Sequence, residues 1–377
     1  MAKVKLGKYL QEYSVKNKKN EKFPVYSVTN VNGFCKDYFN KDVSSENKTT
    51  YKIVPFGYFA YNPSRINVGS IACQEKEKNV IVSPLYTVFN CSQDLNRKYL
   101  MYFFKSEHGM RLINSSVSGS VRFNLKFKTL CEFEIIERSI EEQEEAVKIF
   151  DNILELIRNC DEQLKCLDEL VKSQFIEMFG DPITNEKEWE VKELNEVADV
   201  RDGTHDSPKY YDSGYPFVTS KNLVNGGIDF TTCQLISEED YLHFNDRSYV
   251  DDGDILMPMI GTIGGAIIVN KDRDFAIKNV ALIKFNKNNK VVNRTFVHNI
   301  LNSDSMNEYF NHVKKGGTQN FISLGLIRKI PTILPPIELQ NKFADFVQQI
   351  DKSKYIVQQR KIKYQELLNK KMDEYFK

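Results

Sequence analysis

Two long helical patterns, 197 residues apart, constrain the fold of this chain more than any other feature of its 377 residues. The segments "IEEQEEAVKIFDNI" (140–153) and "IELQNKFADFVQQI" (337–350) both begin with Ile-Glu-x-Gln and both end in an apolar residue at the same offset. Neither proline nor glycine occurs from Ile140 to Phe179. About 40 helical residues would form a rod of roughly 60 Å. The "GDP" at 180–182 ends this helix, and the "LPP" at 334–336 starts the second one.

Apolar residues recur in heptads along both segments, which is typical of helices that pair with each other. In the second segment, Ser353 and Arg360 interrupt one of the two apolar lines. We expect the helices to pair through Phe150, Ile153, Ile157, Leu164, Leu167, Val171, Phe343, Phe346, Ile350, Val357, Tyr364 and Leu367.

The charges of the two segments favour the same pairing. Residues 141–181 carry 12 acidic and 4 basic side chains, a net charge of −8. Residues 337–377 carry 6 acidic and 9 basic side chains, a net charge of +3. Because flanking charges influence the choice of partner helix, an acidic and a basic helix of equal length favour a coiled coil. Either orientation could be reached, and antiparallel pairing would suit a circular arrangement.

The repeat continues outside the helices. The segments 23–33 and 215–227 share an aromatic-Pro start and a glycine turn, and 54–72 and 250–268 share turn glycines and short apolar strands. In 115–135 and 314–334, a polar loop is followed by what we expect to be an alternating strand just before each long helix. Chance similarity of two long helices would not explain a common start, end and offset, so we interpret the chain as a duplication. The predicted fold is α+β: two tandem globules with many short strands, at 1–140 and 182–336, and two spacer helices, at 141–181 and 337–377. The helices are expected to pair as an antiparallel coiled coil in a pseudo-twofold circular arrangement.

The sequence predicts neither a catalytic site nor a metal site. It has no G-x-x-x-x-G-K-[ST] phosphate loop, and the "YNPSR" at 61–65 lacks the second proline and the aromatic residue of an adenine-methyltransferase motif. The seven cysteines and five histidines show no metal-ligand spacing. Scattered cysteines, no signal peptide and no apolar stretch of membrane-spanning length favour a cytoplasmic protein that does not enter a membrane.

The distribution of charge indicates where nucleic acid could bind. Residues 1–140 have 22 basic and 12 acidic side chains, a net charge of +10, and residues 271–336 have 11 and 4, a net charge of +7. Residues 182–254 have 6 and 17, a net charge of −11, so part of the second globule is expected to face solvent or a protein. Basic loops with Asn, Gln, Ser and Thr can contact phosphates and base edges. The candidate DNA-binding residues are Thr29, Asn30, Arg65, Ser118, Ser120, Arg122, Thr204, His205, Ser220, Lys221, Asn222, Lys315, Thr318, Gln319 and Asn320.

The chain resembles the specificity subunits of Type I restriction–modification systems over essentially its full length. The resemblance rests on the order globule–helix–globule–helix and on five segments: "PPIELQNKF", "RSIEEQEEA", "FIEMFGDP…W", "YPFVTSKNL" and "GDILMPMIGTIGG". The first globule departs most, because it lacks the Pro-Pro before its helix and the "GDIL" segment.

This resemblance implies that each globule reads one half of a split double-stranded DNA target and that the paired helices act as a spacer. Two modification (methyltransferase) subunits would supply the S-adenosylmethionine chemistry, and restriction subunits would supply ATP- and Mg-dependent translocation and cleavage. The chain itself would bind no cofactor and catalyse nothing. Three alternatives remain: an orphan DNA-binding module, a fragment of a fused nuclease–methyltransferase, and a coiled-coil adaptor that does not touch DNA. The starting Met and the complete duplicated plan favour an intact subunit over the fragment.

Overall fold

The computed structural model describes residues 2–36, 47–116, 124–224, 226–260, 265–285, 291–313 and 321–377. The chain forms two compact units. The first unit comprises Met1–Glu162 with Gln358–Lys377, and the second comprises Gln163–Val357. Each unit therefore contains part of both long helices, α4 (Ile140–Phe179) and α10 (Ile337–Phe376).

The first unit is built around an antiparallel four-stranded sheet in the order β2-β9-β6-β7. Its strands are β2 (Leu10–Glu12), β9 (Thr87–Cys91), β6 (Phe59–Tyr61) and β7 (Ile71–Cys73). Three two-stranded sheets accompany it: β1 (Lys3–Lys5) with β10 (Glu134–Ile136), β3 (Ser27–Thr29) with β4 (Gly33–Cys35), and β5 (Lys52–Pro55) with β8 (Asn79–Val82). The helices are α1 (Arg97–Lys105), α2 (Glu107–Ser115), α3 (Phe127–Cys131) and the 3-10 turns η1 (Leu6–Lys8) and η2 (Ile66–Val68).

The second unit has a four-stranded sheet in the equivalent order, β12-β20-β17-β18. Its strands are β12 (Asp199–Asp202), β20 (Val280–Lys284), β17 (Ile255–Pro258) and β18 (Ile267–Ile268). A second sheet joins β13 (Tyr215–Thr219) to β16 (Gln234–Ile236) and, in parallel, to β19 (Ala276–Lys278). Two strand pairs complete the unit: β11 (Val191–Glu193) with β21 (Pro331–Ile333), and β14 (Leu223–Val224) with β15 (Gly227–Ile228). The helices are α5 (Leu194–Val197), α6 (Glu238–Ser248), α7 (Arg294–Leu301), α8 (Asp304–Val313), α9 (Leu324–Arg328), η3 (Ser220–Asn222) and η4 (Phe230–Thr232).

The repeat predicted from the sequence is present in the structure. Helices α1 and α7 begin 197 residues apart, as do α2 and α8, α3 and α9, and α4 and α10. The α+β fold with two tandem globules and two long helices is therefore confirmed. One local expectation is wrong: the segment before each long helix is not a continuous alternating strand. It contains a short helix, α3 or α9, and then a three-residue strand, β10 or β21.

The glutamine of each Ile-Glu-x-Gln element ties the long helix to its globule. Gln143 is buried; its Oε1 accepts a hydrogen bond from the Asn96 amide at 2.8 Å, and its Nε2 donates to the carbonyls of Asp94 and Arg138. Gln340 makes the same set, accepting from the Asn293 amide at 2.8 Å and donating to the carbonyls of Val291 and Pro335. Because a buried amide must be paired, this position requires a side chain that both donates and accepts.

A glycine and an arginine recur together in both units. Gly57 and Gly253 both have a φ of 81°, in the left-handed region that glycine adopts most easily. A Cβ at either position would also clash with a guanidinium, that of Arg97 at the first glycine and that of Arg294 at the second. The turn before β6 and the turn before β17 therefore share the same arrangement of a left-handed glycine next to an arginine side chain.

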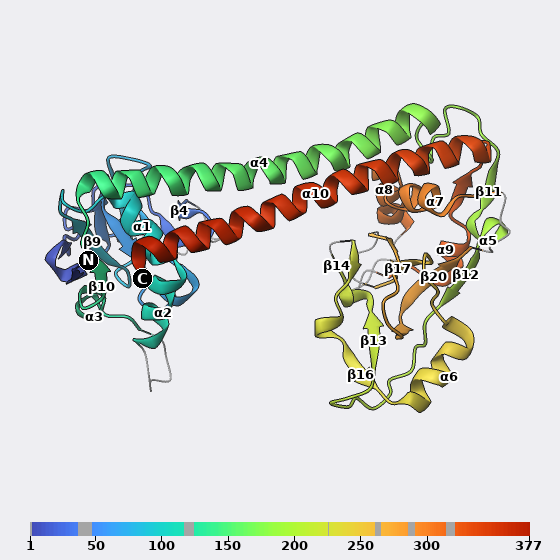
Figure 1. Ribbon diagram of the computed structural model, residues 1–377, viewed down its shortest axis with the longest axis horizontal. Helices are drawn as coiled ribbons and strands as arrows, with labels where there is room; N and C mark the ends of the chain where they lie inside the picture. Colours follow the sequence, from blue (N-terminus) through green and yellow to red (C-terminus); the bar gives the residue numbers. More distant parts are fainter. Residues whose placement is uncertain are drawn as a thin grey trace. The chain divides into compact units, whose positions relative to one another are not determined.

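The two long helices run antiparallel inside each unit (Figure 1). In the first unit, the Phe150 ring lies 5.6 Å from the Tyr375 ring, and the Asp161 carboxylate lies 2.5 Å from the Lys361 ammonium. In the second unit, the Phe175 ring lies 5.5 Å from the Phe343 ring. There the Asp168 carboxylate lies 2.6 Å from the Lys354 ammonium. Residues later in α4 therefore contact residues earlier in α10, as predicted for an antiparallel pair.

The residues predicted to pair the two long helices form the seam between them, and their burial in the structure shows that one of these predictions is wrong. Six are buried: Phe150, Ile153, Val171, Phe343, Ile350 and Val357. Five are half-buried: Ile157, Leu164, Leu167, Phe346 and Tyr364. Leu367 is 39% exposed, whereas the neighbouring Leu368 is 9% exposed and belongs to the apolar core. Leu368 follows Tyr364 by four residues, and the same step places the half-buried Lys354 and Lys361 after Ile350 and Val357.

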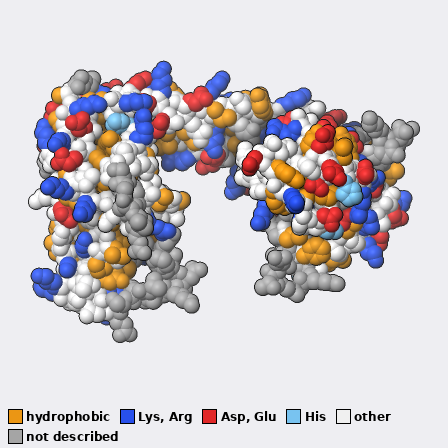
Figure 2. All heavy atoms as spheres, turned by 90° about the horizontal axis from the view of Figure 1, so that it is seen from below, with side chains coloured by type: hydrophobic (Ala, Val, Ile, Leu, Met, Phe, Trp, Pro, Cys, Tyr) orange, Lys and Arg blue, Asp and Glu red, His pale blue; other side chains and the backbone are white. Residues whose placement is uncertain are grey.

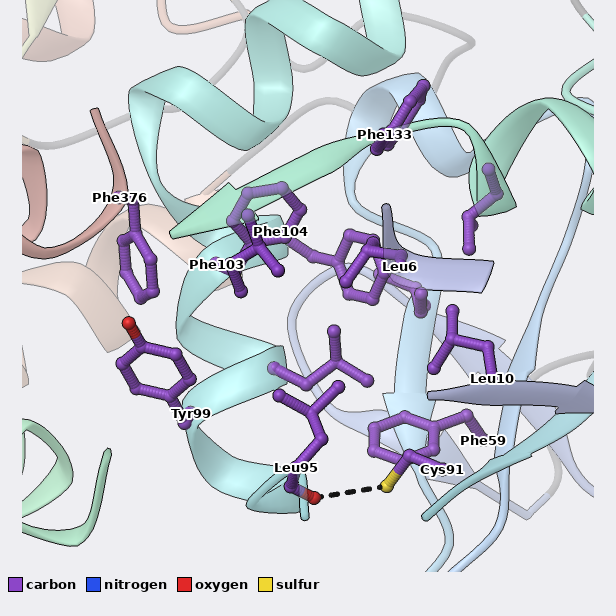
Figure 3. Close-up of a cluster of buried hydrophobic side chains, with 14 of the residues drawn as sticks. Leu6, Leu10, Phe59, Cys91, Leu95, Tyr99, Phe103, Phe104, Phe133 and Phe376 are labelled. Carbon is purple, nitrogen blue, oxygen red and sulfur yellow. Dashed lines mark hydrogen bonds between the residues drawn. The ribbon is translucent and has the colours of Figure 1, made fainter. Parts of the chain in front are cut away.

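The core of the first unit includes the C-terminal end of α10 (Figure 3). The ring of Phe376 lies 4.9 Å from that of Tyr99, 5.7 Å from that of Phe103 and 5.8 Å from that of Phe150. Phe376 is 1% exposed, so it is as buried as the residues of the globule itself. Burial of a large aromatic side chain of this kind stabilises a fold by about 2–3 kcal/mol.

Candidate DNA-recognition surfaces

Two predicted segments of the first unit lie next to each other. Thr29 and Asn30 are in the hairpin between β3 and β4, where Thr29 Oγ1 accepts a hydrogen bond from the Asn32 amide at 3.1 Å. The hairpin is fixed to the loop after β6, because Ser70 Oγ donates to the Val28 carbonyl at 2.7 Å. That loop also carries Arg65, whose side chain is exposed. Thr29, Asn30 and Arg65 therefore belong to one surface.

The predicted loops before the long helices lie outside the described residues. They contain Ser118, Ser120 and Arg122 in the first unit, and Lys315, Thr318, Gln319 and Asn320 in the second. The described residues after each loop are held alike: the Leu125 amide donates to the Pro63 carbonyl, and the Ile322 amide donates to the Met259 carbonyl, both at 3.0 Å. In the first unit this places the end of the loop beside the segment that carries Arg65.

In the second unit, two predicted segments meet at Asn279, a residue that the sequence did not single out. His205 Nδ1 lies 2.5 Å from Asn279 Oδ1, and Ser220 Oγ donates to the Asn279 carbonyl at 3.1 Å. Asn279 has a φ of 54°, in the left-handed region, which asparagine tolerates better than most residues. The amide of Thr204 donates to the Ile277 carbonyl, so the loop with Thr204 and His205 follows the edge of β19.

The buried carboxylate of Asp202 helps to fix the position of His205. Asp202 is 6% exposed, its Oδ2 lies 3.0 Å from His205 Nε2, and its Oδ1 accepts from Arg247 of α6. Both ring nitrogens of His205 therefore have partners, and the side chain holds the loop in place. Asp202 and Arg247 were not expected at this site, because their contribution comes from tertiary contacts that no local pattern indicates.

Asn222 differs from the prediction that it contacts DNA. It is 4% exposed, and its Oδ1 accepts from the Thr219 amide at 2.9 Å and from Thr219 Oγ1 at 2.8 Å. Its Nδ2 donates to Thr232 Oγ1 at 3.2 Å. The amide therefore holds the η3 turn together, and its exposed neighbour Lys221 is the residue that can reach a ligand.

A recess of about 570 Å³ opens at the same place in the second unit. Its lining combines aromatic, hydroxyl, amide and ammonium groups, among them Tyr210, Phe217, Thr219, Lys221, Gln234 and Lys278. Lys278 donates to Ser207 Oγ at 2.8 Å, and Tyr210 is 49% exposed. Such groups can stack on bases, bond to base edges and contact phosphates. The surface is thus suited to nucleic acid.

The two units differ in surface charge, as the sequence predicts. In the face drawn in Figure 2, Lys and Arg side chains are spread over the first unit, whereas Asp and Glu gather on the second. Within the described residues, no group of His, Cys, Asp and Glu side chains is arranged to hold a metal ion. The described helices also include none with the length and apolarity needed to cross a membrane.

Comparison with known proteins decides the family. The family model for the Type I restriction modification DNA specificity domain matches residues 1–165 and 186–365. The chain belongs to this family. The resemblance noted from the sequence is therefore confirmed, and the two matched stretches show that the family's domain occurs twice.

Individual relatives agree with this assignment. The Type I restriction enzyme MjaIX specificity subunit of Methanocaldococcus jannaschii is 29% identical over 175 residues. That alignment spans 41% of this chain and 40% of the relative, so it covers well under half of the relative's length.

Two solved structures share the fold across the whole chain. One is a chain from a study of complex assembly and conformational transition in the type I R-M system. It has a TM-score of 0.63 and 16% identity, and the match covers 100% of this chain and 97% of that one. The other is the Type-I restriction-modification S subunit from M. genitalium, with a TM-score of 0.52 and 15% identity, covering 100% and 96%. At these identities the likeness concerns the fold alone.

Proposed function

We propose that this protein is the non-catalytic DNA sequence-recognition subunit of a Type I restriction–modification complex. Each globule, 1–140 and 182–336, reads one half of a bipartite double-stranded target. The observation that carries this proposal is the duplication of one architecture within a family of DNA specificity domains. Each copy presents a polar hairpin or turn, at Thr29–Asn30 or at Ser220–Lys221, beside the residues that follow a polar loop.

The two long helices set the gap between the half-sites and bind two modification subunits. This part of the proposal is supported by apolar side chains that the helices leave exposed. In the first unit these are Leu156, Ile362 and Leu367, and in the second they are Leu170, Ile176, Tyr355 and Ile356, with exposures of 39–62%. Burial of exposed apolar side chains such as these against a partner is common in protein–protein interfaces.

Partner subunits supply the chemistry in this proposal. Modification subunits bring S-adenosylmethionine and methylate adenine, and restriction subunits bring ATP and Mg for translocation and cleavage. The chain contributes sequence choice only and acts in the cytoplasm. Family membership supports these roles, and the residues described in the structure add the surface that would contact DNA.

The test is reconstitution with the purified chain and its modification subunit. We expect no methyl transfer by the chain alone, and adenine methylation at a bipartite site when both proteins are present. Methyl transfer by the isolated chain would contradict the proposal. A complex that binds duplex DNA without methylating it would instead favour an orphan DNA-binding module. A chain with no salt-sensitive duplex binding would favour a protein adaptor.

A further inference from the structure

The second unit contains a groove of about 800 Å³ beside its long helices. Helices α4 and α10 form one side, and α7 and α8, which lie close to α10 in Figure 1, contribute to the other. The groove is lined by Val171, Phe175, Asn299, Asp345, Val347 and Asp351, among others. All of its lining residues belong to the second unit.

The equivalent position in the first unit is filled. The Tyr102 ring of α1 packs edge-on against the Phe150 ring of α4, with 5.0 Å between their centres. Tyr102 Oη donates to Asp151 Oδ1 at 2.5 Å, and the same carboxylate pairs with the Lys98 ammonium at 3.1 Å. Burial, and then the hydrogen bond to Asp151, raise the pKa of Tyr102. The hydroxyl therefore stays a donor, and the first unit is closed here.

The offset of 197 identifies what changed between the two copies. Tyr102 corresponds to Asn299, and Phe150 corresponds to Val347. Lys98 and Asp151, the other partners in the first unit, correspond to Thr295 and Gln348, which are uncharged. Both rings are thus replaced by smaller side chains, and the ion pair is absent. Asn299 turns back on its own helix, donating to the Thr295 carbonyl at 2.8 Å, and leaves the space open.

The charges along the groove indicate what could occupy it. Five aspartates and two lysines line it, together with the neutral amides and hydroxyls of α7 and α8. The lysines are already paired, Lys354 with Asp168 at 2.6 Å and Lys172 with Asp304 at 2.8 Å. Lys354 also lies 3.8 Å from Asp351, yet five aspartates against two lysines leave the groove with a net negative charge. Asp345 and Asp351 are exposed on α10, beside an apolar floor formed by Val171, Phe175 and Val347. An anionic polymer such as DNA is disfavoured here, and a cationic amphipathic segment fits.

We propose that this groove binds a basic amphipathic helix of a protein partner, one per chain, with no equivalent site in the first unit. The apolar side of the helix would cover the floor, and its Lys or Arg side chains would pair with Asp345 and Asp351. This mode is the ordinary one for a helix in a groove. The site would break the twofold equivalence of the chain, because two identical subunits bound to the repeat could not both use it. The inference does not depend on DNA reading.

The test uses the full-length chain and a fluorescein-labelled synthetic peptide of about 18 residues, with Leu at helical i, i+3, i+4 spacing and Lys elsewhere. Fluorescence anisotropy should show one bound peptide per chain. Asn299→Tyr, which installs the residue of the closed copy, should weaken binding at least about tenfold. Asp345→Asn with Asp351→Asn should weaken it by a similar factor. The matched controls are Asn299→Ala, which loses the same hydrogen bond but leaves the groove open, and a peptide with Glu in place of Lys.

Asn299→Ala should bind the peptide within about twofold of the natural chain, and the Glu peptide should not bind. Equal thermal unfolding of the two Asn299 variants would show that the loss of binding does not come from misfolding. If Asn299→Tyr is folded and binds as tightly as Asn299→Ala, the groove is not the site. Two equivalent peptides per chain, or equal binding of the Glu peptide, would also overturn the proposal.

Discussion

The Lys361 ammonium lies 2.5 Å from the Asp161 carboxylate, at a seam position where a coiled coil normally has an apolar residue. One heptad away, Lys354 pairs with Asp168 in the same way. The lysine side chains are only 29% and 23% exposed, so each depends on its partner more than a surface lysine does. Polar groups at seam positions commonly fix the register of paired helices at some cost in stability.

A charge-swap cycle measures this dependence. Asp161→Lys should destabilise the first unit, because two ammonium groups then face each other at the seam. Asp161→Lys combined with Lys361→Asp should recover most of the loss. We expect a coupling energy of about 0.5–1 kcal/mol in urea unfolding, since Asp161 is half exposed. Lys165→Asp with Glu169→Lys, a swap of an exposed pair within α4, serves as the control and should show almost no coupling. Additive effects at Asp161 and Lys361 would show that the pair does not hold the register.

The buried amides of Gln143 and Gln340 should each be hard to replace. Gln340→Leu removes three hydrogen bonds, one from the Asn293 amide and two to the carbonyls of Val291 and Pro335, so we expect a loss of about 2–4 kcal/mol. Gln143→Leu should cost a similar amount in the first unit. Glu338→Leu, an exposed change in the same first turn of α10, is the control and should be nearly neutral. Urea unfolding measures both, and similar values for Gln340→Leu and Glu338→Leu would contradict the role assigned to the amide.

His298 gives the second unit a dependence on pH. Burial lowers the pKa of this imidazole, against a smaller opposing effect of its hydrogen bond to the Ala266 carbonyl and of Asp351, while Lys354 adds to the lowering. The unfolded chain therefore binds a proton that the folded chain does not, once the pH falls below about 6.5. The free energy of unfolding should decrease from pH 7 towards pH 5. His298→Met, which installs the equivalent Met101 of the first unit, should reduce this slope, and an unchanged slope would exclude His298 as its source.

Neighbouring residues of the η3 turn should respond differently to alanine. Lys221→Ala should weaken binding to all duplexes and reduce the salt dependence by about one phosphate contact, with little change in stability. Asn222→Ala should lower the stability of the second unit by about 1–3 kcal/mol, because Asn222 is buried and fully hydrogen-bonded. Binding curves at several salt concentrations and unfolding curves separate the two effects.

The loop that contains Lys315, Thr318, Gln319 and Asn320 is expected to read one half-site. Alanine at all four positions together should change target choice in that half-site only, and unchanged binding and choice would refute the loop assignment.

The helices are expected to act as a ruler. Removing residues 157–163 from α4 and the matching 354–360 from α10 keeps the heptad in phase and shortens each helix by about 10.5 Å. The gap between half-sites should then shrink by at most about 3 base pairs, while the half-site sequences stay the same. Mapping methylated sites with the double-deletion protein measures the gap. An unchanged gap in a folded, active complex would mean that the helices do not set it.

Local patterns were sufficient to predict the long helices, their pairing and the duplication, because each depends on periodicity or on a shared motif. The antiparallel orientation was expected only because it suits a circular arrangement. The exact seam was harder, since Lys354 and Lys361 occupy inward positions and the apolar pattern therefore favoured Leu367 over Leu368. A seam defined by ion pairs cannot be recognised by searching for apolar residues alone.

The candidate recognition surfaces were predictable only as separate segments. Sequence reasoning proposed Thr29, Arg65, His205 and Ser220 from their residue types, and the structure brings these candidates together in two groups. It missed Asn279, because its role comes from a left-handed backbone and from contacts with residues distant in the sequence. It assigned Asn222 to DNA contact because an amide can read a base edge, whereas in the structure this buried amide closes a turn.

The position of Phe376 has a consequence for how the protein is made. A ribosome completes residues 1–162 and then the whole of the second unit before residues 358–377 emerge, yet these residues complete the core around Tyr99 and Phe103. The core of the first unit therefore lacks the side chains of α10 until the second unit has been synthesised. A chain cut short within α10 would present a finished second globule and an unfinished first one. The first globule can therefore complete its core only after α10 has been fully translated.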